Sequence, residues 1–574
     1  MRDKQADIEN EFLAWGFSYK PIQSSYPPIT AFEKSYSTKV GDFLIYIPIE
    51  DPSLLRLPKP LVKKIPECLS NVRLPHLEGN RTICLFDEAT KNVDPLTPRA
   101  VISACLDQLE KIIDGWANGS NLGDIAVEFA SYWESERTCF LLSDAITPRL
   151  FCYDRSPISL ESLYTEYVIA SNSHEANEWS MKRNSTLEES ALPKELCKVL
   201  SVKVNCLFFI PFDQSWPPRS LGDIIEWLGK VDSRSTSSLL DKLRNEAKES
   251  STFMVLLTSG SISVAIRFTL TQLGKAALGV SLPKKKKRHY KLHISALKKN
   301  HCVTSFQRFR VDNATQEYFY TRNNSSPSNL KDKRVCVIGC GTIGGYLTQG
   351  LVQFGAGSGR GMIALYDDDI LKTGNLGRHI LGIQYLNENK SESLAHFMRQ
   401  HSLTSEIYSY KTFTKKDVDL GWDLIVDATG NQSFSILLAK WYRETIARKT
   451  SPSTTLIHSW ISGFGHQAKS FIDHGQGACF ACLFEYKNNP RKDRYPSFKD
   501  KNTPDVSNTF KRTCGESHLP FGPEASMVAT SLALRLIKQE KSKQLNFLQK
   551  NLSELAINYS EKKVDPMRSC PICQ

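Results

Sequence analysis

The chain has no run of about 18 consecutive apolar residues, so we expect no membrane-spanning helix. Residues 1–17 include acidic side chains and lack the apolar core of a secretory signal peptide. The composition is also not that of a disordered protein, because 41% of the residues are hydrophobic and 10% are aromatic. These absences favour a folded cytoplasmic protein, and the length of 574 residues predicts roughly three or four domains.

A strong excess of one charge is also missing. The net charge of +12 permits an acidic partner without requiring one. The densest basic run, Lys284–Arg288, has few aromatic neighbours, so we expect an exposed loop rather than a nucleic-acid site. We therefore expect neither nucleic acid nor a membrane among the partners. Fifteen cysteines without a secretion signal favour free thiols and metal ligands over a disulfide framework.

A glycine-rich turn follows a hydrophobic strand that begins near Val335. Gly339, Gly341 and Gly344 have the spacing Gly-x-Gly-x-x-Gly, and a helix is expected after them. Glycines let the backbone approach a phosphate, and the helix N-terminus adds free N–H groups and the positive end of a dipole. Asp367 lies 23 residues beyond Gly344, where a nucleotide-binding βαβ unit places the carboxylate that binds a ribose.

The residues after this turn favour a nucleoside triphosphate site over a dinucleotide site. Asp369, Asn375, Arg378 and Lys390 follow in order, and an acid, an amide and two cations suit a nucleoside triphosphate with its metal. With these motifs, residues 330–574 resemble the ThiF/MoeB/ubiquitin-activating family, which adenylates the C-terminal carboxylate of a small protein. The resemblance predicts a Rossmann-like adenylation domain that uses ATP and Mg²⁺.

The resemblance also assigns roles within this site. It implies that Asp367 binds the ribose hydroxyls and that Asn375, Arg378 and Lys390 hold the phosphates. Arg322 would reach the nucleotide across a dimer interface, so a homodimer is expected.

The sequence departs from the family pattern at one position of this site. After the strand Leu424–Asp427 the family usually has a second acid that contacts Mg²⁺, but this chain has Gly430. Asp427 or Asp369 could take over, or phosphates and water could hold the metal.

Two Cys-x-x-Cys pairs occur in the C-terminal part of the chain, Cys479 with Cys482 and Cys570 with Cys573. Four thiolates suit tetrahedral Zn²⁺, and a closed site of four ligands is structural. The gap between the pairs is long, but many members of the resembled family close the adenylation domain with such a zinc. The alternatives are unrelated core cysteines or a redox pair.

Two further cysteines are candidate nucleophiles. Cys514 follows Lys511 and Arg512, and nearby cations favour the thiolate form of a cysteine. The resemblance makes Cys514 the residue that takes the acyl group from AMP as a thioester, the alternative being an incidental loop cysteine. Cys84 stands between Ile83 and Leu85, and its alternative is a buried core cysteine.

Residues 1–160 resemble the ubiquitin-conjugating fold in the bacterial branch that is fused to activating domains. The resemblance depends on Pro75-His76 followed by Cys84, and on a helix at 97–116. It makes Cys84 the second nucleophile. His76 is followed by Leu77 and Glu78 rather than by the Pro-Asn of eukaryotic members, so the group that supports amide formation is not identified.

The rest of the chain is divided by composition and by resemblance. Residues 161–203 are predicted as a linker, because much of this stretch is polar. Residues 204–329 occupy the position of an inactive adenylation-like domain in the fused bacterial proteins. The predicted fold is therefore multidomain α/β, with an α+β ubiquitin-conjugating-like domain, an inactive adenylation-like domain, and a ThiF adenylation domain with zinc at 330–574.

The whole pattern most resembles the fusions encoded in bacterial CBASS antiphage operons. This implies ATP-dependent adenylation of a protein C-terminus, a thioester on Cys514, transfer to Cys84, and conjugation to a target lysine. The activated protein would be the cyclic-nucleotide synthase of the operon. Alternatives are a sulfur-carrier adenylyltransferase for cofactor biosynthesis, conjugation of a bacterial ubiquitin-like protein, and an inactive scaffold.

Overall fold

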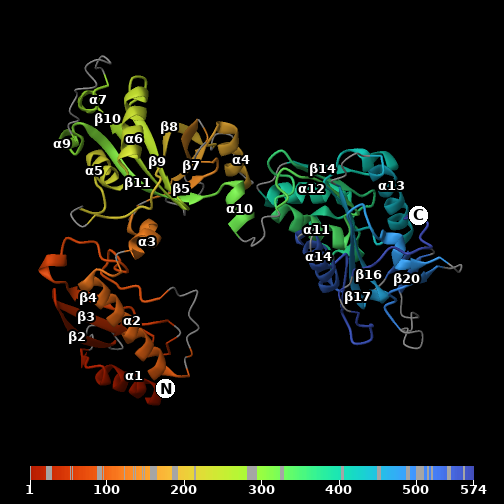
Figure 1. The fold of residues 1–574 in the computed structure, drawn as a ribbon, viewed down its shortest axis with the longest axis horizontal. Coiled ribbons are helices and arrows are strands. Elements are labelled where there is room, and N and C mark those ends of the chain that lie inside the picture. The colour runs from red at the N-terminus through yellow and green to blue at the C-terminus, as the bar shows by residue number, and fades with distance from the viewer. Residues whose placement is uncertain are drawn as a thin grey trace. The chain divides into compact units, whose positions relative to one another are not determined.

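The computed structural model divides the chain into two compact units, one of Met1–Ser180 with Thr186–Ala314 and one of Met181–Ser185 with Thr315–Gln574. Figure 1 colours the first from red to green and residues 315–574 of the second from green to blue. The structure describes all residues except 1, 21–28, 52, 55, 87–93, 95, 122, 134, 136, 145, 146, 148, 156–164, 184–191, 212–214, 281–293, 323–328, 403–405, 449–453, 487–490, 499–509, 514, 515, 519, 520, 540–544, 560, 562 and 574. The basic run Lys284–Arg288 and Cys514 lie outside the described residues.

The first unit opens with an antiparallel sheet covered by two helices. The elements are α1 (Arg2–Ala14), β1 (Ser18–Tyr19), β2 (Thr30–Thr38), β3 (Gly41–Ile49), β4 (Leu61–Lys64), the 3₁₀ turn η1 (Glu67–Leu69) and α2 (Pro98–Asn118). Alternate residues of β3 are buried with apolar faces of α1 and α2 in one core. Pro98 begins α2, and Gly119 ends it with a φ of +78°.

The remainder of this unit is a closed barrel of seven strands in the order β10-β11-β5-β7-β6-β8-β9. Side chains from all seven strands fill its interior, and helices α3, α5 and α6 pack apolar residues outside it. The elements are α3 (Asp124–Tyr132), β5 (Arg137–Leu141), β6 (Leu150–Arg155), β7 (Glu166–Ala170), α4 (Ser173–Arg183), β8 (Lys194–Lys203), α5 (Leu221–Val231), α6 (Ser233–Glu246), β9 (Thr252–Ser259), β10 (Ile262–Leu270), α7 (Gln272–Ala277), α9 (Ile294–Leu297) and β11 (Val303–Asn313).

The barrel corrects two boundaries and one fold expectation. The linker predicted at 161–203 contains β7, α4 and β8. β7 is buried over four of its five residues, whereas α4 and β8 mix buried residues with polar ones, and this polar content resembles a connector in sequence. The first domain does not extend to 160, because β5 and β6 belong to the barrel. The strands between residues 204 and 329, β9 to β11, form one barrel together with the earlier strands β5 to β8. This closed barrel differs from the adenylation-like domain expected at 204–329.

The second unit contains a seven-stranded sheet in the order β14-β13-β12-β15-β16-β17-β22. The first five strands in this order are parallel, and β17 and β22 are antiparallel to their neighbours. The strands are β12 (Arg334–Ile338), β13 (Met362–Tyr366), β14 (Ile407–Tyr410), β15 (Leu424–Asp427), β16 (Thr455–Ser462), β17 (Gln467–Asp473) and β22 (Phe547–Asn551), with short pairs β18 (Phe484–Glu485) and β19 (Lys492–Asp493), and β20 (Phe510–Thr513) and β21 (Glu516–His518).

Helices cover both faces of this sheet (Figure 1). Helices α11 (Thr342–Gln353), α12 (Lys390–His401) and α14 (Pro523–Lys538) share a core with Val335 and Val337, whereas α13 (Gln432–Ile446) shares one with Cys336 and Ile338. Burial on both faces explains why these strands are continuously hydrophobic. The unit also contains α10 (Gln316–Arg322) and the 3₁₀ turns η3 (Thr373–Asn375), η4 (Ile383–Tyr385), η5 (Lys415–Asp419), η6 (Gly463–Gly465) and η7 (Phe480–Leu483). The Rossmann-like fold predicted for this region is confirmed.

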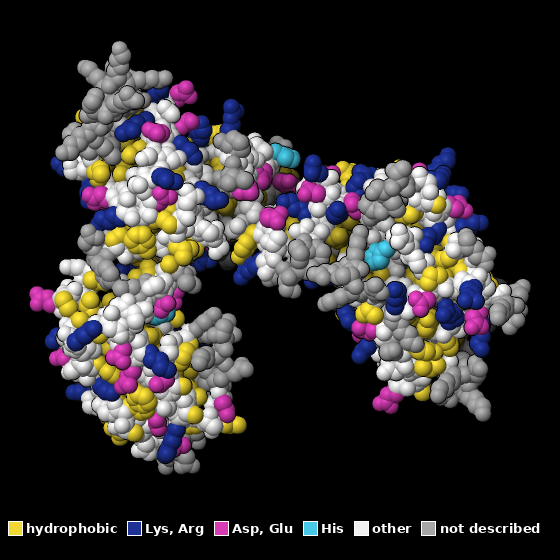
Figure 2. Space-filling view, in the orientation of Figure 1, with side chains coloured by type: hydrophobic (Ala, Val, Ile, Leu, Met, Phe, Trp, Pro, Cys, Tyr) yellow, Lys and Arg dark blue, Asp and Glu magenta, His cyan; other side chains and the backbone are white. Residues whose placement is uncertain are grey.

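The described surface is mixed in charge. On the face seen in Figure 2, Lys and Arg side chains are interspersed with Asp and Glu over both units. Among the described residues, every helix is too short or too polar to cross a bilayer.

Candidate nucleotide and thiol sites

The glycine-rich turn joins β12 to α11 and leaves the N-terminus of the helix open. Gly339 has a φ of +88°, and a Cβ there would lie 2.8 Å from the backbone nitrogen of Thr429. A Cβ on Gly344 would overlap the carbonyl oxygen of Gly339. Gly341 is different, because nothing lies within 4 Å of the position of its Cβ. Gly339 and Gly344 therefore shape the turn, whereas Gly341 keeps open the space in front of the helix, where a phosphate fits.

Asp367 and Asp369 lie beside this turn at the end of β13. The carboxylate of Asp367 accepts the N–H of Cys340 at 2.6 Å and the N–H of Asp369 at 2.9 Å. Lys390 begins α12, and its Nζ lies 2.5 Å from Oδ2 of Asp369. Burial alone would raise the pKa of Asp369, but the ion pair with Lys390 outweighs this and lowers it. The structure thus brings three predicted site residues together around the glycine turn.

Asn375 and Arg378 lie in the loop after β13. The side-chain oxygen of Asn375 accepts the N–H of Lys372 at 3.0 Å, and its carbonyl accepts the N–H of Arg378 at 3.0 Å. The guanidinium carbon of Arg378 lies 4.3 Å from the ring centroid of Phe521, and burial lowers the pKa of Arg378. Because its oxygen is used within the turn, Asn375 acts at least in part by holding the segment that carries Arg378.

His379 is a site residue that the sequence analysis missed. Its side chain is buried, and Nδ1 accepts the N–H of Leu381 at 3.1 Å. Nε2 therefore carries the proton and donates to the carbonyl of Cys340 at 2.9 Å. Burial lowers the pKa of His379, which favours this neutral form. The ring ties the Arg378 loop to the glycine turn, and only its place directly after Arg378 could have indicated it.

Asp427 ends β15 and is fully enclosed. Its Oδ2 accepts from Ser435 at 2.5 Å and from Nδ1 of His458 at 2.8 Å, and its Oδ1 accepts from the hydroxyl of Thr429 at 2.7 Å. Burial would raise the pKa of Asp427, yet these hydrogen bonds and His458 lower it. Both oxygens are committed within the protein, so Asp427 is poorly suited to replace the acid missing at Gly430.

The four cysteines of the two Cys-x-x-Cys pairs meet in one cluster. All four sulfurs lie within 4.8 Å of one another, with 3.6 Å between Cys479 and Cys570 and between Cys482 and Cys573. Tetrahedral zinc with Zn–S bonds of about 2.3 Å holds sulfurs roughly 3.8 Å apart, so the cluster fits this metal. Cys479, Cys482 and Cys570 are buried, which is typical of a structural site.

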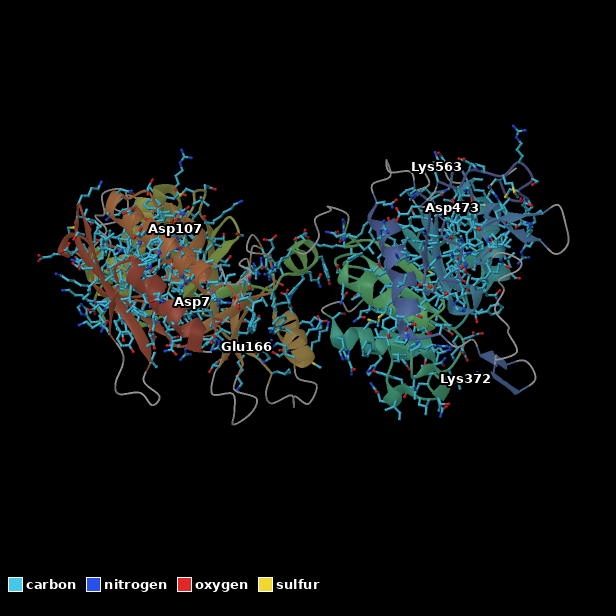
Figure 3. All side chains as sticks on the ribbon, turned by 90° about the horizontal axis from the view of Figure 1, so that it is seen from below. Asp7, Asp107, Glu166, Lys372, Asp473 and Lys563 are labelled. Atoms are coloured by element: carbon cyan, nitrogen blue, oxygen red, sulfur yellow. The ribbon has the colours of Figure 1, made fainter. Side chains whose placement is uncertain are left out.

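Arg443 on α13 fixes the loop that precedes the cysteine cluster. Arg443 pairs with the buried Asp473 at 2.8 Å and donates to the carbonyls of Gly475, Gly477 and Ala478. Figure 3 shows Asp473 well apart from Lys372, which lies 3.7 Å from the site carboxylate Asp369. The thiol cluster therefore braces a different part of the unit.

Cys84 is exposed, whereas its neighbours Ile83 and Leu85 are buried. Its backbone N–H donates to the carbonyl of His76 at 2.9 Å, and Leu77 bridges to Ile83. The alternation of inward and outward side chains presents the thiol to solvent. The alternative of a buried core cysteine is wrong.

Comparison with known families assigns both ends of the chain. The sequence model of the ThiF family matches residues 319–572, and that of prokaryotic E2 family B matches residues 10–142. The chain thus has one segment that matches the prokaryotic E2 model and one that matches the ThiF model, and these segments are called the E2 domain and the ThiF domain below. The glycine turn, Asp367, Lys390 and the four-cysteine cluster all lie in the ThiF domain, and Cys84 lies in the E2 domain.

Several relatives align with this chain over almost their whole length. The Escherichia coli (strain TW11681) protein called ATP-dependent ubiquitin transferase-like protein Cap2 is 28% identical over 94% of this chain and 93% of its own. Proteins of the same name from Vibrio cholerae and Pseudomonas aeruginosa are 27% and 25% identical over 98% and 91% of this chain, and 97% and 90% of their own.

Two predicted site residues of the ThiF domain are not tested by this geometry. Arg322 is exposed at the end of α10, where its guanidinium carbon lies 5.5 Å from the ring centroid of Tyr318. Its role toward a nucleotide stays a prediction. Cys514 lies outside the described residues, and its role as a nucleophile also stays a prediction.

Proposed function

We propose that this chain uses ATP to activate the C-terminal carboxylate of a protein and to join it to an amine. The observation that carries the proposal is the pairing of a ThiF-family domain with an E2-family domain that exposes Cys84. The relatives that share this pairing are called ATP-dependent ubiquitin transferase-like proteins.

The first step is adenylation. A carboxylate oxygen of the substrate attacks the α-phosphorus of ATP, the bond to the β-phosphate breaks, and acyl-adenylate and pyrophosphate result. Asp367 binds the ribose, while the turn at Gly341, Arg378 and Lys390 hold the phosphates. These cations offset the charge that develops on the departing pyrophosphate.

The next steps pass the acyl group between thiols. The Cys514 thiolate attacks the acyl carbon and AMP leaves. The Cys84 thiolate then attacks the thioester, and the Cys514 thiol is released. A lysine amine finally attacks the Cys84 thioester, which forms an amide and frees the Cys84 thiol. The exposure of Cys84 supports this part of the relay.

Two metals fit the residues present. The four-cysteine cluster would hold Zn²⁺ as a structural ion. For the Mg²⁺ that accompanies ATP, Asp369 is the better candidate because its side chain is 45% exposed, whereas Asp427 is enclosed. Mg²⁺ commonly takes one or two protein carboxylates together with phosphate and water ligands.

We further propose the biological setting. The activated protein is the cyclic-nucleotide synthase of a CBASS antiphage operon in the bacterial cytoplasm, and the acceptors are lysines of target proteins. The enzyme acts as a homodimer in which Arg322 approaches the nucleotide of the partner subunit.

The test is an adduct assay with the full chain, ATP, Mg²⁺ and each protein encoded beside its gene. Reductant-sensitive adducts are followed on gels for wild type, Cys514→Ala and Cys84→Ala. The relay requires adducts that form on both cysteines, the one on Cys84 depending on Cys514. Absence of ATP–pyrophosphate exchange with every such protein would refute adenylation of these candidates and favour the inactive scaffold.

The second candidate is a sulfur-carrier adenylyltransferase, which stops at the acyl-adenylate or a persulfide. It predicts that Cys84→Ala leaves product formation unchanged. A separate outcome, adducts formed only with a small ubiquitin-like protein, would change the substrate and leave the chemistry in place.

A further inference from the structure

The segment that carries Cys84 is held through the backbone of His76. The N–H of Cys84 donates to the carbonyl of His76 at 2.9 Å, and the N–H of His76 donates to the hydroxyl oxygen of Tyr132 at 2.7 Å. Trp116 donates from Nε1 to the carbonyl of Pro75 at 2.8 Å. His76 also has a φ of +60°, a left-handed conformation that is uncommon outside glycine, although histidine adopts it more often than most residues do. Interactions of the His76 side chain can therefore stabilise this backbone conformation.

Two carboxylates fix the side chain of His76. Nδ1 lies 3.0 Å from Glu128 and Nε2 lies 3.2 Å from Asp124, so each ring nitrogen faces a carboxylate. Carboxylates accept hydrogen bonds, and only the imidazolium form can donate from both nitrogens. The hydrogen bond to Glu128 raises the pKa of His76, against the opposing effect of burial and with a further contribution from Asp124.

The two carboxylates come from α3, a helix with two distinct faces. Asp124, Glu128 and Tyr132 follow at intervals of four residues and lie on one side. Phe129, on the other side of α3, and Trp133, directly after its end, are fully buried in the core outside the barrel, where the ring centroids of Phe129 and Trp227 lie 5.5 Å apart. One face of helix α3 therefore contacts His76 in the Cys84 segment, and the other face packs against the barrel.

We propose that His76 is the positioning residue of Cys84, held as an imidazolium by Glu128 and Asp124 so that the barrel fixes the thiol for acyl transfer. This inference rests on the proposed role of Cys84 as acyl carrier. Both ring nitrogens are engaged, so His76 acts through the backbone of Cys84 and does not take a proton from the thiol. The barrel thereby becomes part of the transfer site.

The charge on His76 makes the hold dependent on pH. The charged and titratable groups facing it are Asp124, Glu128 and Tyr132, and Arg73 lies over the ring of Tyr132 at 4.8 Å. Folding raises the pKa of His76. The ion pairs of His76 with Glu128 and Asp124 are therefore fully formed below the ordinary histidine pKa of about 6.5, and they are lost as pH rises through the raised pKa.

The test measures hydrogen exchange at the Cys84 amide in the full chain, read by mass spectrometry with single-amide fragmentation. His76→Asn keeps a residue that tolerates positive φ but removes the imidazolium. Glu128→Gln keeps the shape of the side chain but removes its charge. Asp107→Asn is the matched control, because Asp107, labelled in Figure 3, lies on α2 and pairs there with Lys111 rather than with His76.

Near pH 6 we expect exchange at Cys84 to be about tenfold faster in both variants than in wild type and in the control. After correction for intrinsic exchange, protection in wild type falls as pH rises to about 9 and stays flat in His76→Asn. Protection within twofold of wild type in both variants, or a flat wild-type profile, would overturn the proposal.

A second measurement tests whether the interactions of His76 affect acyl transfer to Cys84. With ATP and the proteins encoded beside the gene as acyl donors, transfer to Cys84 should slow about tenfold in His76→Asn, while pyrophosphate exchange stays unchanged. Unchanged transfer to Cys84 in this variant would also overturn the proposal. If Cys84→Ala itself leaves conjugation intact, the relay is wrong, and the exchange data still decide how the Cys84 segment is held.

Discussion

At Gly341 and Gly344 the same residue type serves two purposes. A side chain at Gly344 would meet the backbone of the turn itself, whereas a side chain at Gly341 would meet only the space in front of α11. The first glycine is needed by the fold, and the second is needed by whatever approaches the helix N-terminus. The difference makes the two positions separable by experiment.

We expect Gly344→Ala to lower the free energy of unfolding by roughly 1–3 kcal/mol, because the added Cβ overlaps backbone. Gly341→Ala should leave thermal unfolding unchanged but reduce ATP–pyrophosphate exchange at least about tenfold. Calorimetry and exchange assays check both. Normal exchange in Gly341→Ala would show that phosphates do not approach this turn.

Asp427 gives a prediction about pH and stability. Its folded pKa is lowered, so its stabilising contribution is present above the unfolded value of about 3.9 and is lost as pH falls through the folded value. Asp427→Asn should cost about 3 kcal/mol at pH 7, because it breaks a buried pair with His458. Chemical denaturation at several pH values measures the cost.

The difference between Asp427→Asn and wild type should shrink below about pH 4. Glu554→Gln, at an exposed side chain, serves as the control and should stay near wild type throughout. A cost independent of pH would mean that the carboxylate charge at Asp427 contributes nothing.

At the scale of elements, the two Cys-x-x-Cys turns connect the start and the end of the last segment of the ThiF domain. The turn at η7 provides Cys479 and Cys482, and the C-terminal turn provides Cys570 and Cys573. The two turns are 91 residues apart along the chain, so their meeting closes a long loop. A bound metal would therefore stabilise the whole C-terminal part of this domain.

We expect about one zinc per chain by plasma mass spectrometry and little or none in Cys570→Ser. Loss of the metal should lower the melting temperature by roughly 10 °C, because binding energy of a structural zinc is folding energy. Cys68→Ser, at an exposed cysteine of the E2 domain, should keep both values. Full zinc content in Cys570→Ser would exclude this cluster as the site.

At the scale of the whole molecule, the two compact units divide the proposed chemistry. Thr315–Gln574 belongs to the unit that contains the nucleotide site, and Cys84 belongs to the other. The units have separate cores, so each is expected to fold without the other. The relay needs both because its two thiols lie on different units.

A fragment of residues 315–574 should therefore retain ATP–pyrophosphate exchange with the activated protein within about threefold of the full chain. The same fragment should form no adduct on Cys84 unless residues 1–314 are added. Circular dichroism of the fragment provides the folding control. A folded fragment without exchange would show that the first unit contributes to the nucleotide site.

Local sequence patterns were sufficient for the doubly wound sheet, the glycine turn and the cysteine pairs. A buried parallel strand is continuously hydrophobic, a phosphate turn needs glycine at fixed spacing, and zinc ligands come in close pairs, so each feature is written within a few neighbouring residues. The exposure of Cys84 was also predictable, since alternation along an extended segment turns it away from Ile83 and Leu85.

Only the tertiary structure decided the features that depend on distant segments. The barrel pairs β5 with β11 across more than 150 residues, and no local pattern specifies that partner. Within residues 161–203, β7 and β8 pair with other strands of the barrel, which the polar content of this stretch does not indicate. Contacts between distant segments also bury Asp427 between Ser435 and His458. They likewise bring the carboxylates of α3 to His76. Side chains that meet only after folding leave no periodic signal in the sequence, because each is positioned by a different element.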